Sequence, residues 1–193
     1  MSSYLFLRTK PRRRRQGKTD YRKRLKLVKS GVERLVVRRT NRRLIAQLVR
    51  SKAGGDQTMI TVSSDMLASY GWKASFKSTP AAYLTGVMLG KKALEKGFKE
   101  AILDMGVYRS VKGSRIYAVL KGVLDAGLHV PASEEMLPDE DRIRGRHITK
   151  YYPTARQNTA SPLFSRTDEQ YIQKLEENVV KVKQMIMEGS GDE

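Results

Sequence analysis

The stretch ERLVVRRTNRRLIAQLVRSK, from Glu33 to Lys52, decides the fold. It holds two short apolar runs, Leu35 to Val37 and Leu44 to Val49, on either side of a basic tip. Runs this short and this rich in β-branched residues are typical of strands. Thr40-Asn41 predicts a tight reversal between them, because asparagine tolerates the positive φ that a two-residue hairpin loop needs. The stretch therefore predicts an antiparallel hairpin whose second strand is covered on both faces.

The tip of this hairpin concentrates positive charge. Four arginines flank Thr40 and Asn41, namely Arg38, Arg39, Arg42 and Arg43. Their mutual repulsion is unfavourable unless an anion lies among them, which predicts a contact with RNA. A solvated hairpin end, whose charges discourage edge-to-edge aggregation, explains the same residues equally well. On the tip alone, both interpretations stay open.

The composition favours the first interpretation. The chain has 193 residues, with 38 Lys and Arg against 20 Asp and Glu, a formal net charge of +18. Such an excess predicts a polyanionic partner, either nucleic acid or an acidic membrane face. The absence of cysteine excludes disulfides and thiolate metal sites and fits a reducing compartment. No stretch has the apolar length of a signal peptide or a membrane span, so we expect a soluble intracellular protein.

The charge is unevenly distributed along the chain. Residues 1–131 contain 29 basic and 8 acidic residues, a net +21, whereas residues 132–193 contain 9 and 12, a net −3. This split predicts a polyanion-binding body and a separate C-terminal extension. We therefore divide the chain into a basic arm with a cationic helix (1–31), an α/β core (32–131) and an extension with an acidic amphipathic helix (132–193).

The N-terminal arm is almost devoid of apolar side chains. KPRRRR, from Lys10 to Arg15, cannot fold alone and predicts a disordered segment. A short helix follows, with Thr19 as its cap and Gly31 at its end. A nuclear-type address and a membrane-surface helix are alternatives for this region. The apolar stripe of the helix is too thin for strong membrane insertion, which favours nucleic acid.

The remainder of the core alternates between strand and helix patterns. QTMITVS (57–63) predicts a third antiparallel strand, and AILDM (101–105) a fourth strand that pairs in parallel after a helical crossover. A short helix is expected over 65–70, and longer ones begin at Thr79-Pro80 and Ser114. The expected fold is α/β, a mixed sheet of a three-strand meander and one parallel strand, with helices on its faces.

Two details of this region bear on packing and on binding. Gly86 and Gly90 lie one turn apart on the apolar face of the long helix, which predicts close approach of that helix to a sheet. A phosphate-binding loop is rejected here, because the glycine spacing and the residue after the lysine are both wrong. Tyr108, Arg109 and Lys112 lie in a flexible loop after the fourth strand and form a second candidate RNA contact.

Several motifs together resemble one protein family. LVVRRTNRRLIAQLV, KKALEKGFKEAILD and VLDAGLHVP are similar to large-subunit ribosomal protein eighteen, whose eukaryotic relative is large-subunit ribosomal protein five. The similarity covers about Arg12 to Pro131, and RIRGRHI (142–148) resembles the extension of archaeal and eukaryotic members. The resemblance implies a ribonuclease-H-like topology and a structural role in the large subunit of the cytoplasmic ribosome. It implies attachment of 5S rRNA to 23S rRNA in the central protuberance, beside neighbouring ribosomal proteins, with no cofactor and no small-molecule substrate.

The C-terminal extension has its own pattern. Thr167-Asp168-Glu169-Gln170 forms a capping box, followed by an apolar stripe at steps of three and four. The stripe consists of Ile172, Leu175, Val179, Val182 and Ile186. Its acidic helix should avoid phosphates and dock on the body of the protein or on a ribosomal neighbour. Archaeal relatives imply helix over 151–165, but Pro153, Asn158 and Pro162 predict a loop there.

The sequence thus predicts an rRNA-binding structural protein and not an enzyme. The candidate RNA contacts are Lys10, Arg12, Arg13, Arg14, Arg15, Lys18, Arg22, Arg24, Arg38, Arg39, Thr40, Asn41, Arg42, Arg43, Tyr108, Arg109 and Lys112. A nuclease is the rival, but metal-dependent cleavage needs several converging carboxylates and the apolar parts of the predicted strands carry only Asp104. His129 and His147 do not suggest a metal site, and a recognition-helix motif for DNA is missing.

Overall fold

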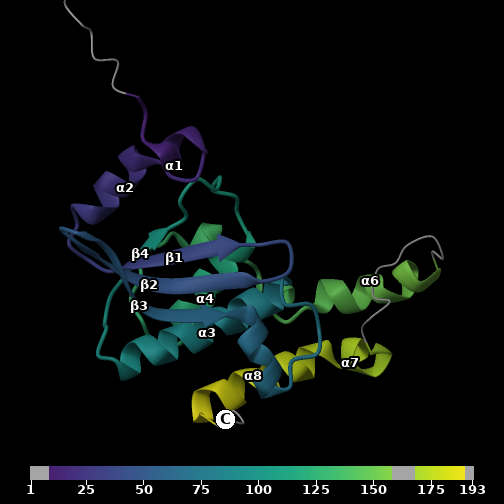
Figure 1. Cartoon of the computed structure of the whole chain (residues 1–193). Coiled ribbons are helices and arrows are strands. Elements are labelled where there is room, and N and C mark those ends of the chain that lie inside the picture. The colour runs from purple at the N-terminus through teal and green to yellow at the C-terminus, as the bar shows by residue number, and fades with distance from the viewer. Residues whose placement is uncertain (1–8, 158–167, 190–193) are drawn as a thin grey trace, which may run out of the picture.

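The computed structural model describes residues 9–157 and 168–189 and has the expected α/β fold (Figure 1). Its sheet has the strand order β3-β2-β1-β4. The strands are β1 (Arg34–Arg39), β2 (Leu44–Lys52), β3 (Gly55–Ser63) and β4 (Ile102–Asp104). β1, β2 and β3 form an antiparallel meander, and β4 pairs with β1 in parallel. The predicted mixed sheet is confirmed, and its order agrees with a ribonuclease-H-like topology.

Helices precede, cover and follow this sheet. The described ones are α1 (Arg12–Arg15), α2 (Tyr21–Val28), the 3₁₀ helix η1 (Ser64–Tyr70), α3 (Thr79–Glu95), α4 (Arg115–Asp125), the 3₁₀ helix η2 (Glu134–Met136), α5 (Glu140–Ile143), α6 (Arg146–Gln157), α7 (Glu169–Gln173) and α8 (Leu175–Glu188). In Figure 1, α1 and α2 lie on the β4 side of the sheet, and α8 lies on the far side of α3. The basic and acidic ends of the chain are therefore separated in space.

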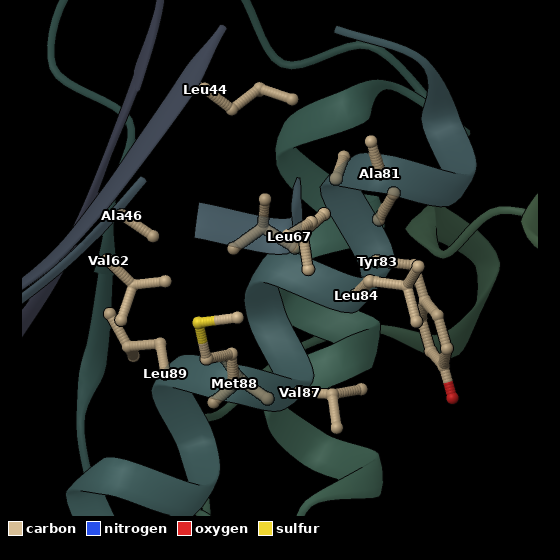
Figure 2. Packing of buried hydrophobic residues seen from close by; sticks show 14 of the residues in the cluster. Leu44, Ala46, Val62, Leu67, Ala81, Tyr83, Leu84, Val87, Met88 and Leu89 are labelled. Carbon is tan, nitrogen blue, oxygen red and sulfur yellow. The ribbon is translucent and has the colours of Figure 1, made fainter. Parts of the chain in front are cut away.

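One face of the hairpin forms the floor of the core. Alternate side chains of a strand point to opposite faces, so the paired residues Leu35 and Leu48 share a face, as do Val37 and Ala46. All four are fully buried. Figure 2 shows Leu44, Ala46 and Val62 pointing from the sheet towards α3, with Leu44 nearer the Ala81 end of that helix and Val62 nearer Met88 and Leu89. On the other face of β2, Val49 is buried as predicted, whereas Ile45 is only half-buried, so this face is covered at one end of the strand and partly open at the other.

The close approach predicted for Gly86 occurs, but its partner is a helix and not the sheet. A Cβ atom on Gly86 would lie 2.0 Å from the carbonyl oxygen of Val119 in α4. The contact is reciprocal, because a Cβ on Gly122 of α4 would lie 2.1 Å from the carbonyl oxygen of Tyr83. Glycines on both helices therefore let the backbones of α3 and α4 touch. The prediction of a helix–sheet contact at this position was wrong.

Replacing Gly86 with alanine should strongly destabilise the protein. In an unobstructed helix this change would add about 1 kcal/mol of stability. Here the methyl group meets backbone, which cannot rotate away, so we expect a loss of about 3 kcal/mol or more. Denaturant unfolding measures the change. Gly54→Ala is the matched control, because a Cβ there meets nothing within 4 Å. A Gly86→Ala variant as stable as the control would show that α3 and α4 can separate freely.

Ser114 precedes α4 as predicted, whereas α2 and α3 are each capped one residue away from the predicted cap. Asp20 and not Thr19 caps α2, because its carboxylate accepts hydrogen bonds from the backbone nitrogens of Arg22 and Lys23 at 3.0 and 3.2 Å. Ser78 caps α3 through a 3.3 Å bond from the Ala81 nitrogen, which places Thr79 inside the first turn. In both cases a neighbouring side chain competes for the same free N–H groups.

The C-terminal helix docks on the body of the protein, the first of the two expected alternatives. Its apolar stripe is buried, and residues of α8 join the same hydrophobic cluster as those of α3. Lys91 of α3 donates hydrogen bonds to the carbonyl oxygens of Ile186 and Met187, both at 2.9 Å. The ammonium group of Lys91 thus caps the last carbonyls of α8 and holds the end of that helix.

Asp168 caps α7, because its carboxylate accepts a hydrogen bond from the Gln170 nitrogen. Thr167 of the predicted capping box lies outside the described residues.

Residues 151–157, predicted to be a loop, are helical. α6 continues to Gln157 with Pro153 in its interior, so the prediction is wrong for 151–157, and 158–165 lie outside the described residues. A proline costs a helix one backbone hydrogen bond. Tyr152 and Ala155 beside it are each only 3% exposed. Burial of these side chains outweighs the lost bond.

Candidate nucleic-acid interface

The basic arm contains one helical turn where the sequence predicted disorder. α1 is held by the carbonyl oxygen of Pro11, which accepts from the nitrogens of Arg14 and Arg15 at 2.9 and 3.1 Å. The fixed φ of proline prepares this start. The cationic side chains themselves remain in solvent. The exposed ones are Lys10, Arg12, Arg13, Arg14, Arg15, Lys18 and Arg22.

Local hydrogen bonds turn the arm back towards α2. Arg13 Nε donates to Thr19 Oγ1 at 2.8 Å, which links the two short helices. The backbone N–H of Lys23 is the main cause that lowers the pKa of Asp20, so this cap stays ionised at neutral pH. Charge on Asp20 also balances the positive end of α2. The arm is therefore shaped before any partner binds.

A chain of ion pairs joins α2 to the sheet. Arg24 Nη2 lies 3.0 Å from Asp56 Oδ1, and Arg34 Nη2 lies 2.7 Å from Asp56 Oδ2. Arg34 Nη1 then donates to Asp104 Oδ2 at 2.6 Å. Burial works to raise the pKa of Asp56, but the hydrogen bonds from Arg34 and Ser51 and the charges of Arg34 and Arg24 act together against it, and the net effect is a lowered pKa. Arg24, predicted as a phosphate contact, is thus half-buried and already engaged by a carboxylate.

These groups surround a small hollow between the arm and the sheet, of about 100 Å³. The predicted contacts Arg13, Lys18, Arg24 and Arg38 meet there, although they come from three different elements. The charged side chains that line it are Arg13, Lys18, Lys23, Arg24, Arg34, Arg38, Asp20, Asp56 and Asp104. Six cations against three carboxylates leave an excess of positive charge. The field at this side of the molecule therefore attracts anions.

The hairpin tip is a four-residue connection from Thr40 to Arg43, not the two-residue reversal predicted at Thr40-Asn41. The Thr40 nitrogen donates to the Arg43 carbonyl oxygen at 2.9 Å. The Thr40 hydroxyl donates to the same oxygen at 2.8 Å and accepts from the Arg43 nitrogen at 3.0 Å. Threonine side chains commonly close turns in this way. Thr40 thus shapes the tip, while Asn41 and Arg42 are exposed at its end.

The four tip arginines do not share one environment. Arg43 Nη1 lies 2.5 Å from Asp65 Oδ2, and the Ser63 hydroxyl and then Arg43 lower the pKa of this carboxyl. The Arg39 guanidinium stacks over the Tyr108 ring, 4.7 Å from its centroid. Arg38 packs on Gly106, where an added Cβ would lie 2.6 Å from its Nη1. Stacking and pairing relieve the repulsion that the sequence implied.

The loop after β4 is tied to the end of β1. The Tyr108 hydroxyl accepts from the Arg39 nitrogen at 3.2 Å and donates to the Arg39 carbonyl oxygen at 3.1 Å. Tyr108 is therefore an anchor of the loop, and Arg109 and Lys112 are its exposed cations. The loop, the arm and the base of the tip thus lie together on one side of the sheet.

Sequence reasoning missed two side chains near the tip. Arg115 at the start of α4 donates from Nη1 to the carbonyl oxygen of Lys77 at 2.9 Å. Burial and the charge of the nearby Arg39 lower the pKa of Arg115. Arg115 is therefore a fifth guanidinium that interacts electrostatically with the tip arginines. Phe76 lines a hollow together with the tip residues. Neither residue belongs to a basic run or an apolar stripe, so neither gave a sequence signal.

The residues that a nuclease would need are arranged differently. Asp104 accepts from Arg34 and, through Oδ1, from the Gly106 nitrogen at 2.8 Å, so its carboxylate serves the fold. Within residues 9–157 and 168–189, no three His, Cys, Asp or Glu side chains are grouped to hold a metal ion. In the same part of the chain, no helix has the length and apolar character needed to span a membrane.

Comparison with known proteins gives the family. Residues 6–100 and 95–133 match the model of a family described as ribosomal large subunit proteins 60S L5 and 50S L18. A protein named large ribosomal subunit protein uL18 from Methanoculleus marisnigri is 54% identical over 142 residues, 74% of this chain and 81% of its own length. Proteins of the same name from Korarchaeum cryptofilum and Methanothermobacter thermautotrophicus are 56% and 47% identical, over 75% and 80% of this chain and 74% and 81% of their own lengths. The chain therefore belongs to the family of large-subunit ribosomal proteins that includes 60S L5 and 50S L18.

Proposed function

We propose that this protein is a structural constituent of the large subunit of the cytoplasmic ribosome, where it binds 5S rRNA and attaches it to 23S rRNA. The family is one of structural ribosomal proteins and not of enzymes, which supports this role. The observation that carries the RNA part is that the arm, the loop after β4 and Arg38 at the base of the tip border one hollow with an excess of cations, and that further exposed cations of the arm, the loop and the tip lie around it. The acidic α8 lies away from them, packed against α3.

The two parts of this surface suit different features of RNA. The arm presents exposed cations that neutralise phosphates without reading sequence. The tip presents Asn41 and Arg42 at the end of a rigid hairpin, and such groups can reach base edges in loops and bulges. An arm for the backbone and a tip for unpaired nucleotides together would recognise a folded RNA by its shape.

Titration of the purified protein with 5S rRNA, beside a transfer RNA of similar size, tests this proposal. We expect tight binding of 5S rRNA that persists at a salt concentration where the transfer RNA is released. A protein bound to 5S rRNA should then also retain a 23S rRNA fragment from the central protuberance. Equal affinity for all three RNAs would show a non-specific cation surface and would reject the proposed role.

Deletion of residues 1–18 should weaken binding of 5S rRNA and flatten its salt dependence. The deleted segment carries seven basic residues, Arg8, Lys10, Arg12, Arg13, Arg14, Arg15 and Lys18. Each neutralised phosphate contributes about 0.9 or less to the log–log salt slope, so if half of them contact RNA the slope falls by roughly two to three units. The described part of the arm has no buried apolar side chain, so thermal unfolding should change little.

A matched variant separates this effect from a general loss of charge. Lys174→Gln/Lys181→Gln neutralises two exposed lysines of the C-terminal helical segment, away from the arm. We expect the salt slope of this variant to equal that of the full chain. A slope that stays unchanged on deletion of the arm would mean that the arm is merely solvated.

A further inference from the structure

An open hollow at the hairpin tip contains an aromatic ring among polar and cationic groups. Thr40, Asn41, Arg42 and Arg43 form one wall, and Asp65 and Phe76 form the other. Its volume is about 610 Å³, within the range of about 300–1,000 Å³ that is typical of small-molecule pockets. A single nucleotide therefore fits between the tip and the Phe76 ring.

The position of Phe76 is fixed by the turn that carries it. The nitrogen and the hydroxyl of Ser78 both donate to the carbonyl oxygen of Ser75, at 3.3 and 2.8 Å. Arg115 binds the carbonyl oxygen of Lys77 from the other side. Trp72 and Ala74, four and two residues earlier, are buried in the core, whereas the Phe76 ring is only half-buried. The ring is thus presented to the hollow by a backbone that is already ordered.

We propose that this hollow receives one unpaired nucleobase of the bound RNA, stacked on the Phe76 ring. This inference rests on the proposed function and names a subsite of the RNA surface. Sequence-specific proteins recognise RNA largely at unpaired bases, which stack on aromatic side chains. The exposed Arg42 beside the hollow then faces the phosphates of the same nucleotide, since these lie outside the stacked base.

The carboxylate in the wall favours a base over a phosphate. Asp65 is half-exposed and its lowered pKa keeps it ionised; its Oδ1 is buried, so the oxygen that faces the hollow is Oδ2, which also accepts from Arg43. A phosphate placed against this carboxylate would be repelled, and the exposed Arg42 is the better position for it. A base can instead donate an N–H group to a carboxylate, and the Asn41 amide offers both donors and an acceptor to the base edge. The wall therefore has the mixed donors and acceptors that suit a base.

Phe76→Leu tests the proposal, because leucine fills the half-buried space but offers no ring to stack on. We expect affinity for 5S rRNA to fall about 5- to 100-fold, the effect of losing one base–aromatic stack. The log–log salt slope should not change, because the ring is uncharged. Phe76→Tyr keeps the stack and should bind like the parent. Phe98→Leu is the matched control, since Phe98 is also half-buried but lies near Arg50, at the opposite end of the hairpin.

A second measurement uses the unchanged protein. Ultraviolet irradiation of its complex with 5S rRNA joins stacked rings to bases, so the peptide containing Phe76 should carry a nucleotide and the peptide containing Phe98 should not. Full affinity of Phe76→Leu, with no nucleotide on the Phe76 peptide, would overturn the subsite while 5S rRNA binding itself stands. Failure of the unchanged protein to bind 5S rRNA would instead overturn the proposed function.

Discussion

Replacing Arg34 with methionine is expected to lower the free energy of unfolding by about 3–5 kcal/mol, as breaking a buried ion pair usually does. Arg34 is 3% exposed and Asp104 is 6% exposed. Their 2.6 Å pair lies in the interior, where water cannot solvate a carboxylate that has lost its partner. Asp56 would lose a partner as well, but it is more accessible to water and keeps Arg24. Urea unfolding measures the change.

Two further variants decide whether the buried charge is the cause. Arg50→Met breaks the Arg50–Glu33 pair of the same 2.6 Å length, but Arg50 is about half exposed, so we expect a loss below about 1 kcal/mol. Arg34→Met/Asp104→Leu removes both buried charges and should regain most of the lost stability, because apolar replacements of a buried pair are often neutral. A double variant as unstable as Arg34→Met would point to lost packing and not to an unpaired carboxylate.

The Arg34–Asp104 pair also shows why the sequence predicted the strands but not the contacts between them. Arg34 and Asp104 are 70 positions apart, and they meet only because β4 pairs with β1 in parallel. The sequence predicted that a parallel strand exists, from its apolar run after a helix. It did not give the register, which depends on contacts across the whole core. The sequence therefore marked Asp104 only as the single acid on the apolar parts of the predicted strands, and its role in the scaffold appears only in the structure.

Local patterns predicted the elements better than they predicted partners. The meander followed from short β-branched runs and turn residues, whose preferences act within a few positions. The Gly86 spacing correctly predicted a close backbone approach, but a glycine fits a helix as well as a sheet. Pro153 is the reverse case, because burial of its neighbours overrode a local preference. In both cases tertiary contacts decide the outcome, and no residue-by-residue preference contains them.

In the binding surface, too, the sequence predicted which residues are candidates but not which groups they contact. Residue type alone marked the arginines of the arm and the tip, since clustered positive charge is visible in any sequence. The role of each candidate could be assigned only from the structure. Tyr108 anchors its loop to Arg39, and Arg43 forms an ion pair with Asp65. Phe76 stands in a segment without periodicity, ASFKS, and only its place beside the tip makes it a candidate.

The largest expected effect on binding comes from the tip. Replacing Arg38, Arg39, Arg42 and Arg43 together with glutamine removes four charges and largely keeps the length of the side chains. Charge-assisted hydrogen bonds contribute about 1.5–3 kcal/mol each, so binding of 5S rRNA should weaken by several kcal/mol if even two arginines contact RNA. Lys174→Gln/Lys181→Gln, which neutralises lysines far from the tip, should bind like the parent.

Stability of the free protein provides the other half of this test. The Arg43–Asp65 pair is about half exposed, so its loss should cost at most about 1 kcal/mol. Losing the stack of Arg39 on Tyr108 should cost about 0.5–1 kcal/mol, while relief of charge repulsion acts in the opposite direction. Thermal unfolding should therefore change little while RNA titration at fixed salt changes greatly. A large loss of stability with unaltered binding would mean that the arginines serve the fold, and a variant unchanged in both measurements would mean that the tip is a solvated hairpin end.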